Sequence, residues 1–357
     1  MTATPQQPVS ESPTPQHLDP QHADPHRADP QRAARMILTV TANPSLDRTI
    51  ELSGHLQRGA VQRSVSTTDE PGGKGVNVSR ALVASGAETV AVLPGALDDP
   101  VLVALRERGV PTVNLPIDVR LRSNVTVTEP GGTTTKINEL GPDLSAHADA
   151  LTALIVEHAP LASWLVLAGS LPPGLPTTWL ADVVRAVRAS CGDDAPRIAV
   201  DSSGEPFAAL IASGVGVDLV KPNAEELAEI VGGDPAEYEA DPASAVEGAR
   251  RLRGLGVETV LLTLGSAGAL LIDGEGSWFA AAPVITALST VGAGDSSLSG
   301  YLLAETTGAP APARLAQAVA SGAAAAALPG SIVPSLDQTF PDDIDVVPVA
   351  PAAVGHL

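Results

Sequence analysis

One short segment, Leu288 to Leu298, constrains the fold most strongly, because its pattern predicts an extended stretch that changes to a helix through only three small residues. Gly292 and Gly294 allow the backbone to turn tightly and to come close to a ligand. The N–H groups of Gly292, Ala293 and Gly294 would converge at the helix start, where they favour a negative group. Asp295 stands at the same place, and a carboxylate there suits removal of a proton from an alcohol that attacks a phosphoryl group.

The same residues are also compatible with simpler structures. Asp295 could be an ordinary helix N-cap after a Gly-x-Gly turn, since Asp is a favoured capping residue. A dinucleotide-binding turn fits less well, because Ser297 takes the place of its third glycine and no strand with a ribose-binding acid follows. A P-loop is excluded, because Gly-x-x-x-x-Gly-Lys-Ser/Thr occurs nowhere in the sequence.

Composition narrows the classes of function further. The 357 residues carry a formal net charge of -20, which argues against binding to nucleic acid or to an anionic membrane. Any phosphate site must therefore be a local basic pocket in an acidic protein. The single cysteine, Cys191, excludes an internal disulfide and a cysteine-rich metal site. No apolar run reaches membrane-spanning length and no signal-peptide core follows Met1, so we expect a cytoplasmic protein.

The two ends of the chain differ from its centre. Residues 1–35 are rich in Pro, Gln and His, and a five-residue unit built around Asp-Pro appears in them three times. Such a segment cannot bury enough apolar surface to offset the entropy of ordering, which predicts a disordered N-terminal tail. A buried-strand pattern begins at Met36, and we predict one folded domain over residues 36–340 and a C-terminal tail over 341–357.

From Met36 onward, strand patterns alternate with helix patterns. This alternation predicts an α/β domain with a mainly parallel sheet and helices on both of its faces. Two β-rich stretches, at about 48–70 and 112–140, interrupt the alternation and are expected to meet as one small sheet over the site. Strands are predicted at 36–41, 89–93, 164–168, 196–200, 217–220, 258–263 and 268–272. Helices are predicted at 76–85, 99–108, 145–158, 177–190, 205–212, 224–231, 242–254, 296–306 and 312–327.

Polar and glycine-rich motifs follow or open several of these strands. In an open α/β sheet, ligands gather at the carboxyl ends of the strands, so we expect the motifs to share one site. They are Asn43-Pro44-Ser45-Leu46-Asp47, Gly72-Gly73-Lys74-Gly75-Val76-Asn77, Arg122-Ser123-Asn124, Gly169-Ser170-Leu171-Pro172-Pro173-Gly174, Lys221-Pro222-Asn223-Ala224-Glu225-Glu226 and Thr263-Leu264-Gly265-Ser266-Ala267-Gly268. Each motif alone also fits an ordinary turn, a helix cap or a surface residue.

The earlier motifs suit a sugar phosphate. Lys74 offers a charge and Asn77 an amide, directly after glycines that permit close backbone approach. The carboxylate of Asp47 could accept hydrogen bonds from two sugar hydroxyls. Arg122 is suited to a phosphate dianion, and Ser170 can hydrogen-bond to one.

The later motifs suit a nucleotide and a metal ion. Lys221 is a candidate for a nucleotide phosphate. Asn223 and Glu226 have the form of a capping box, and the alternative role places them near Mg²⁺ through water, because that ion keeps most of its waters. Gly265 and Gly268 suggest either a close approach to a nucleotide or a plain hairpin-like turn.

Taken in order, the motifs resemble those of the ribokinase-like (PfkB) carbohydrate kinases. The series is Asn-Pro-x-x-Asp, Gly-Gly-Lys-Gly-x-Asn, Arg-x-Asn, Gly-Ser-Leu-Pro-Pro-Gly, Asp-Ser-Ser-Gly, Lys-Pro-Asn-x-x-Glu, Gly-x-x-Gly and Thr-Val-Gly-Ala-Gly-Asp-Ser. The resemblance covers about residues 36–335, and within the family it is greatest to the 1-phosphofructokinase branch. Asp201 opens the Asp-Ser-Ser-Gly motif, which fits this branch without suggesting a role.

The resemblance implies a ribokinase-like three-layer α/β/α domain with a small β-sheet lid, and a homodimer formed through the lids. It implies ATP as co-substrate with Mg²⁺, Asp295 as the catalytic base, and the amides of Gly292, Ala293 and Gly294 as the groups that stabilise the transferring phosphoryl group. The implied acceptor-binding residues are Asp47, Gly72, Gly73, Lys74, Asn77, Arg122, Asn124 and Ser170. The implied ATP-binding residues are Lys221, Asn223, Thr263, Gly265, Gly268, Gly294, Ser321 and Gly322, with Asn223 and Glu226 near Mg²⁺ through water.

These residues predict an enzyme that phosphorylates a ketohexose phosphate with ATP. We expect fructose 1-phosphate as the acceptor and fructose 1,6-bisphosphate as the product. Tagatose 6-phosphate and fructose 6-phosphate are alternative acceptors, because the motifs do not show which end of the sugar carries the phosphate. A non-catalytic sugar-phosphate sensor is a further alternative, although a sensor needs neither a base nor a Mg²⁺ site. A plain ATPase would leave the lid and the acceptor site without a purpose.

Overall fold

A large sheet forms the centre of the molecule. The computed structural model describes Met1 and residues 36–350, so the tail predicted for residues 1–35 lies, apart from Met1, outside the described residues. Within these residues, ten strands form a sheet in the order β14-β13-β12-β11-β10-β9-β8-β1-β4-β5. The strands are β1 (Met36–Val40), β4 (Thr89–Pro94), β5 (Thr112–Leu115), β8 (Ala162–Ala168), β9 (Arg197–Asp201), β10 (Val217–Val220), β11 (Val257–Thr263), β12 (Gly268–Ile272), β13 (Ser277–Ala281) and β14 (Val346–Pro348). The strands from β11 to β5 are parallel, and β12, β13 and β14 pair antiparallel with their neighbours.

Helices cover both faces of this sheet and so give the three layers predicted. One face carries α2 (Lys74–Ala84), α10 (Ala293–Thr306) and α11 (Ala311–Ala326), whose apolar side chains share one core. The other face carries α3 (Pro100–Glu107), α4 (Ala148–His158), α5 (Trp179–Cys191), α6 (Gly204–Ala212), α7 (Ala224–Val231), α8 (Pro235–Ala240) and α9 (Pro242–Arg253). Short 3₁₀ turns are η1 (Ala159–Leu161), η2 (Gly192–Asp194), η3 (Gly265–Ala267), η4 (Leu336–Gln338) and η5 (Pro341–Asp343).

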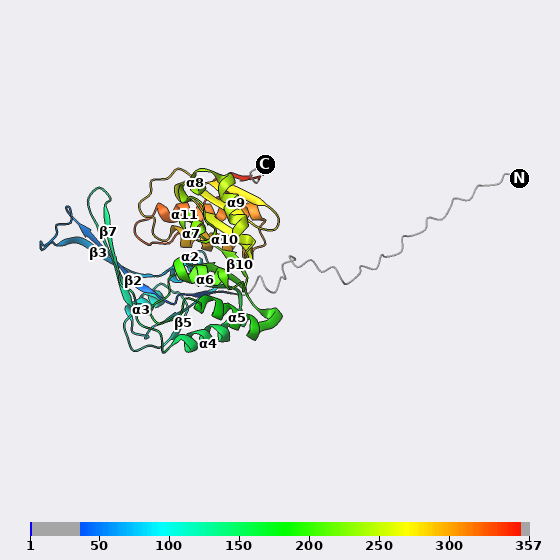
Figure 1. Cartoon of the computed structure of the whole chain (residues 1–357). Helices are drawn as coiled ribbons and strands as arrows, with labels where there is room; N and C mark the ends of the chain where they lie inside the picture. The colour runs from blue at the N-terminus through cyan, green and yellow to red at the C-terminus, as the bar shows by residue number, and fades with distance from the viewer. Residues whose placement is uncertain (2–35, 351–357) are drawn as a thin grey trace.

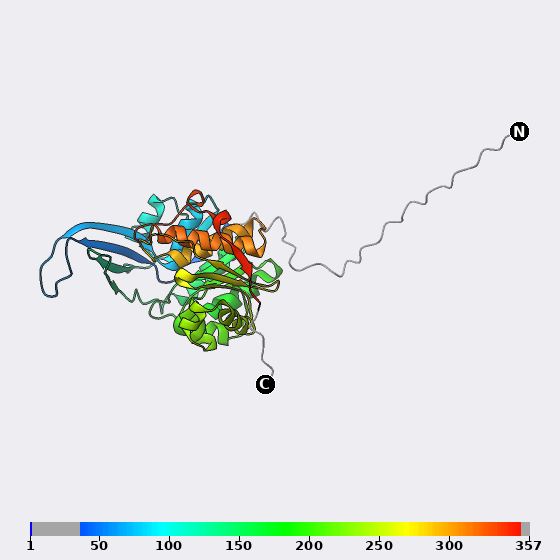
Figure 2. The ribbon, with the colours of Figure 1, turned by 90° about the horizontal axis from the view of Figure 1, so that it is seen from above.

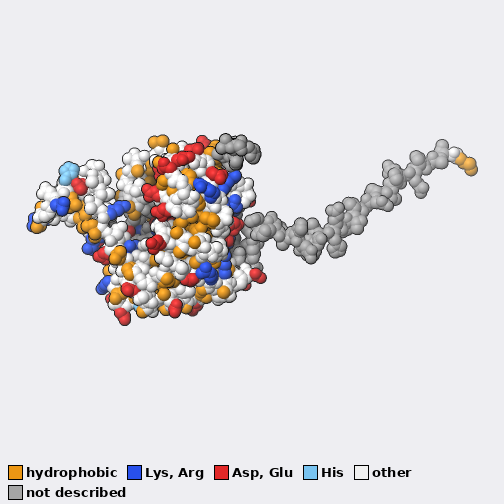
Figure 3. Space-filling model, in the orientation of Figure 1, with side chains coloured by type: hydrophobic (Ala, Val, Ile, Leu, Met, Phe, Trp, Pro, Cys, Tyr) orange, Lys and Arg blue, Asp and Glu red, His pale blue; other side chains and the backbone are white. Residues whose placement is uncertain are grey.

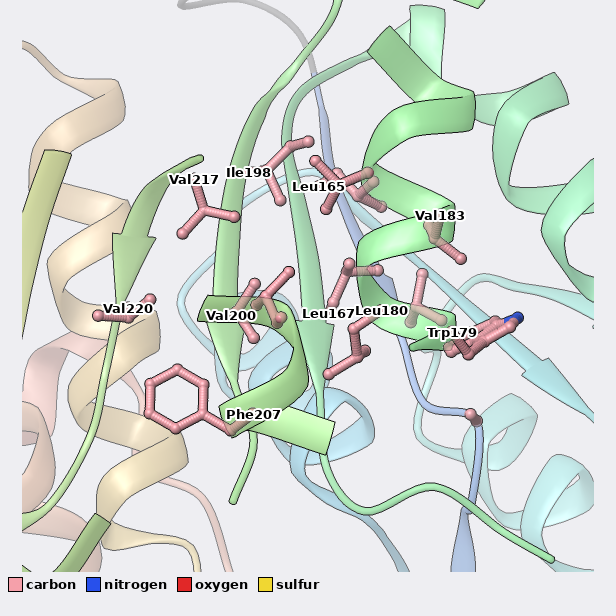
Figure 4. Packing of buried hydrophobic residues seen from close by; sticks show 14 of the residues in the cluster. Leu165, Leu167, Trp179, Leu180, Val183, Ile198, Val200, Phe207, Val217 and Val220 are labelled. Carbon is pink, nitrogen blue, oxygen red and sulfur yellow. The ribbon is translucent and has the colours of Figure 1, made fainter. Parts of the chain in front are cut away.

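The central strands are continuous apolar runs because both of their faces are buried. In β8, Leu165 and Leu167 join the core beneath α5, whereas Trp164 and Val166 join the core on the α10 side. Figure 4 shows part of the first of these cores, where strand side chains such as Leu167 gather with Leu180 and Trp179 of α5. This packing fixes the strand ends, and with them the loops that carry the polar motifs.

A second, smaller sheet projects from the body, and we call it the lid. Its strands are β2 (Ser45–Leu52), β3 (Ser64–Gly72), β6 (Arg122–Thr128) and β7 (Thr134–Asn138), in the order β3-β2-β6-β7. The strand β2 pairs antiparallel with β3 and parallel with β6, so the two β-rich stretches meet in one sheet, as predicted. Figure 1 and Figure 2 show the lid extending away from the helices.

The structure differs from the sequence predictions in the boundaries of several elements and in a few short elements. The lid begins at Ser45, and its second half begins at Arg122 rather than at 112, because β5 pairs with β4 in the large sheet. The sequence patterns predict neither α8 nor the strands β13 and β14. With six and three residues, α8 and β14 are too short to show a clear period. Because β14 pairs with β13, the sheet extends beyond residue 340, where the sequence predicts the start of a C-terminal tail. The last part of that predicted tail, residues 351–357, lies outside the described residues.

The body carries many acidic side chains on its surface. Figure 3 shows Asp and Glu spread over this face, with Lys and Arg in separate small groups, in keeping with the formal net charge of -20. Among the helices of residues 36–350, none combines the length and the apolar character that crossing a bilayer would require.

Candidate active site

The predicted motifs meet at the carboxyl ends of the parallel strands. Asp201 is the last residue of β9, Lys221 directly follows β10, and Thr263 is the last residue of β11. The N-terminus of α10 lies at the same edge, because a Cβ atom placed on Gly294 would be 3.1 Å from Nζ of Lys221. Residues far apart in the sequence are thus brought together at one edge of the sheet.

Helix α10 begins at Ala293, with Gly292 as its N-cap residue. Gly292 has a φ of 79°, a left-handed conformation that glycine adopts without strain. Asp295 lies inside the first turn rather than at the cap, so the simpler interpretation of Asp295 as an N-cap is wrong. The amide of Ala293 makes only a long hydrogen bond of 3.4 Å, to the carbonyl of Thr290. This helix start therefore keeps the amide-rich character that favours an anion.

The carboxylate of Asp295 is buried, with 7% of the residue exposed. Its Oδ2 accepts a hydrogen bond of 2.9 Å from Nδ2 of Asn77, which lies on α2. Burial and the nearby charge of Asp201 raise the pKa of Asp295 to about 6, although Asn77, Lys221 and Lys74 oppose the shift. A carboxyl group of this kind is ionised at pH 7 and can accept a proton near neutral pH.

Asp201 forms ion pairs with two lysines near Asp295. Its fully buried carboxylate accepts a hydrogen bond of 2.7 Å from Nζ of Lys74 and lies 3.1 Å from Nζ of Lys221. Burial disfavours the charge on Asp201, but the two ammonium groups outweigh it and lower the pKa of this carboxyl. The cluster therefore presents two cations and one anion next to the helix start.

The sequence assigns no role to Asp201, and the structure supplies the reason that it was missed. Its partners Lys74 and Lys221 come from two separate motifs, so no local pattern connects them with it. The one available signal is its position as a polar residue at the end of a buried strand, on the edge of the sheet where ligands gather.

Asp47 on β2 faces the turn between β3 and α2. Its Oδ1 accepts hydrogen bonds of 2.7 Å from Ser45 Oγ and 3.0 Å from Nδ2 of Asn124. A Cβ atom at Gly72 would overlap the Asp47 carboxylate, so any other residue there would displace that side chain. Gly73 has a φ of 110°, which again requires glycine and turns the chain into α2. Asp47, Gly72 and Gly73 are thus brought together as predicted.

Arg122 and Ser170 lie at the outer side of this region. Nη1 of Arg122 donates a hydrogen bond of 3.2 Å to the carbonyl of Glu139, whereas its Nε is buried and has no hydrogen-bond partner within the described residues. Arg122 also lines a cavity of about 560 Å³ together with Leu140 and Gly141. The hydroxyl of Ser170 accepts a hydrogen bond of 3.3 Å from Nδ2 of Asn43. A half-buried guanidinium with a buried, unpaired Nε donor beside a cavity is suited to an anion.

The loops after β10 and β11 lie side by side. Asn223 and Thr263 form a β-bridge, and the amide of Thr263 donates a hydrogen bond of 3.0 Å to the carbonyl of Pro222. Gly265 and Gly268, at φ 56° and 127°, carry the chain through η3 into β12. The connection between the antiparallel strands β11 and β12 is therefore the hairpin-like turn that the sequence allowed.

Asn223 and Glu226 form the capping box of α7 that the sequence suggested. Asn223 Oδ1 accepts a hydrogen bond of 2.8 Å from the amide of Glu226, and Oε2 of Glu226 accepts one of 2.9 Å from the amide of Asn223. Oε1 of Glu226 is outside the box and lies 3.8 Å from Nζ of Lys74. No cluster of three or more His, Cys, Asp or Glu suited to a metal ion occurs among the described residues. This donor set fits Mg²⁺ held through water better than a direct protein cage.

Ser321 and Gly322 lie where α11 packs against α10. A Cβ atom at Gly322 would overlap Oγ of Ser297, and one at Gly300 would lie 2.5 Å from Oγ of Ser321. Close helix packing therefore accounts for these small residues by itself. Their predicted contact with a nucleotide stays a prediction.

Comparison with known proteins extends the similarity over most of the chain. The family described as pfkB family carbohydrate kinase matches residues 40–338. A 1-phosphofructokinase of Haloferax volcanii is 36% identical over 313 residues, which cover 87% of this chain and 97% of that protein. The ATP-dependent 6-phosphofructokinase isozyme 2 of Escherichia coli is 30% identical over 309 residues, covering 85% of this chain and 96% of that protein. The structure of Escherichia coli phosphofructokinase-2 in complex with fructose-6-phosphate aligns with a TM-score of 0.75 at 29% identity, over 85% of this chain and 96% of that chain.

These matches agree with the order of the motifs and with the arrangement of the two sheets. The matched residues run from the end of β1 through the lid, the loops at the strand ends and the turn before α10. The chain therefore belongs to the pfkB family of carbohydrate kinases and is a sugar-phosphate kinase with the ribokinase-like fold.

Proposed function

We propose that this kinase transfers the γ-phosphoryl group of ATP to fructose 1-phosphate and releases fructose 1,6-bisphosphate and ADP. The observation that carries the proposal is the position of Asp295. Its carboxylate has a raised pKa and lies at an amide-rich helix start beside the ammonium group of Lys221. A proton acceptor and an anion site are thus adjacent, as phosphoryl transfer to an alcohol requires.

The chemical step follows from this adjacency. The Asp295 carboxylate takes the proton of the acceptor hydroxyl, and the oxygen forms a bond to the γ-phosphorus while the bond to the ADP oxygen breaks. The amides of Gly292, Ala293 and Gly294, together with Lys221, stabilise the negative charge on the transferring group. Mg²⁺, held through water by Asn223 and Glu226, would neutralise charge on the ATP phosphates.

The acceptor would lie between the lid and α2. Asp47, oriented by Asn124, would accept hydrogen bonds from sugar hydroxyls, and Gly72 and Gly73 would allow the sugar to come close. Asn77 would contact the acceptor next to the base. The phosphate already on the sugar would be held by Lys74, Arg122 and Ser170, of which Arg122 offers a buried donor with no partner in the described residues. The ATP side would be lined by Lys221, Asn223, Thr263, Gly265 and Gly268, with Ser321 and Gly322 near the adenine.

A 6-phosphate sugar is the alternative acceptor. The similarity to a 6-phosphofructokinase at 30% identity supports fructose 6-phosphate, whereas the similarity to a 1-phosphofructokinase at 36% identity supports the first choice. Tagatose 6-phosphate would need the same base and the same cations.

We also propose that two copies associate through their lids. Val65 on β3 and Ile137 on β7 are 63% and 61% exposed, and the strand register puts both on the face of the lid opposite Asp47. Apolar side chains left open on one face of a sheet suit contact with a second copy. Light scattering after size exclusion should give a dimer, and Ile137→Lys should give a monomer; a monomeric wild type would contradict this.

The test of the function is an ADP-release assay with ATP and Mg²⁺. Fructose 1-phosphate, fructose 6-phosphate, tagatose 6-phosphate and unphosphorylated fructose are compared side by side. The highest kcat/KM with fructose 1-phosphate supports the proposal, and a preference for a 6-phosphate keeps the mechanism but changes the acceptor. Preference for free fructose would show that Arg122 and Ser170 do not hold a phosphate. Turnover with none of them would favour the sensor.

A further inference from the structure

A buried arginine connects the lid with the candidate base. Arg80 lies on α2 and only 6% of it is exposed. Its Nη1 donates hydrogen bonds of 3.0 Å to the carbonyl of Pro71 and 3.2 Å to Oδ1 of Asn77. Its Nη2 donates one of 2.6 Å to Oε2 of Glu70. Pro71 and Glu70 are the residues just before the end of β3, and Asn77 is the donor to Asp295, so one side chain bridges two parts of the site.

This arginine decides which way the amide of Asn77 points. A guanidinium group can only donate, so the Asn77 atom that faces Arg80 must be the oxygen. The Asn77 nitrogen is then left to donate to Oδ2 of Asp295. If the amide were reversed, an oxygen would face the carboxylate and the hydrogen bond that favours the ionised base would be lost.

The charges around both groups fit this arrangement. Asp295 faces Asn77 and Lys74 from α2, Asp201 from β9 and Lys221 after β10. Arg80 is paired with Glu70, and the charges of Arg108, Asp47 and Asp295 also act on it. Burial lowers the pKa of Arg80, but Glu70 opposes that shift. The guanidinium therefore stands as a buried cation between the carboxylate proposed for acceptor binding and the proposed base.

We propose that Arg80 is a positioning residue that acts through Asn77 on Asp295, and that Glu70 ties this arrangement to the lid. The proposal rests on the function proposed for Asp295. Glu70 pairs with Asp47 in the register of β3 and β2. When an acceptor bound to Asp47 fixes the position of these lid strands, it therefore also fixes the position of Arg80. The lid and the base are thereby coupled by hydrogen bonds rather than by substrate alone.

The competing explanation is a purely structural arginine that anchors α2 to β3. Replacement would then lower stability and leave the pH dependence of turnover unchanged. Arg108 on the loop after α3 provides the matched control, because its Nη2 donates a hydrogen bond of 2.8 Å to Oε1 of the same Glu70. No hydrogen bond of the described structure joins Arg108 to Asn77. Arg108 also keeps Glu70 paired when Arg80 is replaced.

The experiment compares Arg80→Met, Arg80→Lys and Arg108→Gln with the wild type. For Arg80→Met, we expect the acid limb of the kcat–pH profile to move up by about one pH unit, because Asp295 loses a nearby positive charge and an oriented donor. The plateau value of kcat should fall about tenfold, with KM for ATP changed less than twofold. Arg80→Lys keeps the charge and should restore most of the acid limb but not the plateau, and Arg108→Gln should match the wild type. Should Arg80→Met fail to fold, the Lys variant carries the test through its plateau kcat, which should stay below that of the wild type.

A titration that does not need turnover separates this proposal from the proposed function. The carboxyl carbon of Asp295 is followed by ¹³C NMR, with Asp295→Asn identifying its signal. A wild type that turns over no acceptor would refute the proposed function, and the Asp295 signal would still report on Arg80. If the Asp295 pKa is the same in wild type, Arg80→Met and Arg80→Lys, the positioning role of Arg80 is refuted.

Discussion

Replacing Asp295 by asparagine should make the protein more stable while abolishing most of its activity. The asparagine side chain has nearly the same shape, and its amide oxygen can still accept the hydrogen bond from Asn77. The change therefore removes a buried negative charge and little else. Turnover should fall by about two to four orders of magnitude, the usual contribution of a general base.

The size of the stabilisation follows from the pKa of Asp295. Its value of about 6 in the folded protein compares with 3.8 for an ordinary Asp, and each pKa unit corresponds to about 1.4 kcal/mol. Between these two values the folded state binds more protons than the unfolded state, so stability falls as pH rises through this window. The free energy of unfolding of Asp295→Asn should exceed that of the wild type by about 3 kcal/mol above pH 6, and by almost nothing below 3.8.

Urea unfolding of both proteins at about pH 5 and about pH 7.5 measures this difference. We expect the gap to be about half as large at the lower pH. The control is Asp182→Asn, which removes a charge from a side chain that is 51% exposed and should give no such gap. A gap that is the same at both pH values, or an Asn variant less stable than the wild type near neutral pH, would refute the assignment of a raised pKa. Unchanged turnover would refute the role as base.

Three further substitutions test other parts of the site. Gly72→Ala should raise KM for the acceptor at least tenfold and leave KM for ATP unchanged, since its methyl group would push the Asp47 carboxylate aside; an unchanged acceptor KM would contradict the contact. Arg122→Gln should raise KM for the sugar phosphate by about 10- to 100-fold, from the loss of about 1.5–3 kcal/mol of charged hydrogen bonding, but should spare unphosphorylated fructose. Asp201→Asn should lower the pKa of Asp295, because a like charge is removed, so the acid limb of the rate profile should move to lower pH. The same variant should lower Tm, because two lysines lose their shared carboxylate, and an unmoved acid limb would contradict the coupling.

The sequence predicts the fold well because its strongest signals are local. Continuous apolar runs such as residues 164–168 are typical of strands buried on both faces, and the structure buries every residue of β8, which contains this run. The glycines at 72, 73 and 292 also carry a local signal, because each stands where a side chain or an ordinary φ would not fit. The small sheet was predictable from two β-rich stretches, although its register was not.

The contacts between motifs could not be predicted in the same way. The role of Asp201 depends on its ion pairs with two lysines that lie far apart in the sequence. Only the folded sheet brings their ammonium groups to one carboxylate. In the sequence, Arg80 is simply one residue of a predicted amphipathic helix. Its hydrogen-bond partners at the end of β3 depend on how the lid joins the body. The strand β14 is three residues long, and only its pairing with β13 identifies it.

The long connection between β2 and β6 of the lid also bears on the order in which the two sheets form. Ser45 of β2 pairs in parallel with Arg122 of β6, and the chain between them passes through α2, β4, α3 and β5 of the body. Parallel strands need such a crossover, and pairing between distant segments is slow because the intervening loop must first be closed. Here the packing of β4 and β5 beside β1 closes that loop in advance. We therefore expect the pairing of β2 with β6, which completes the lid and the proposed sugar site, to follow the packing of this part of the large sheet.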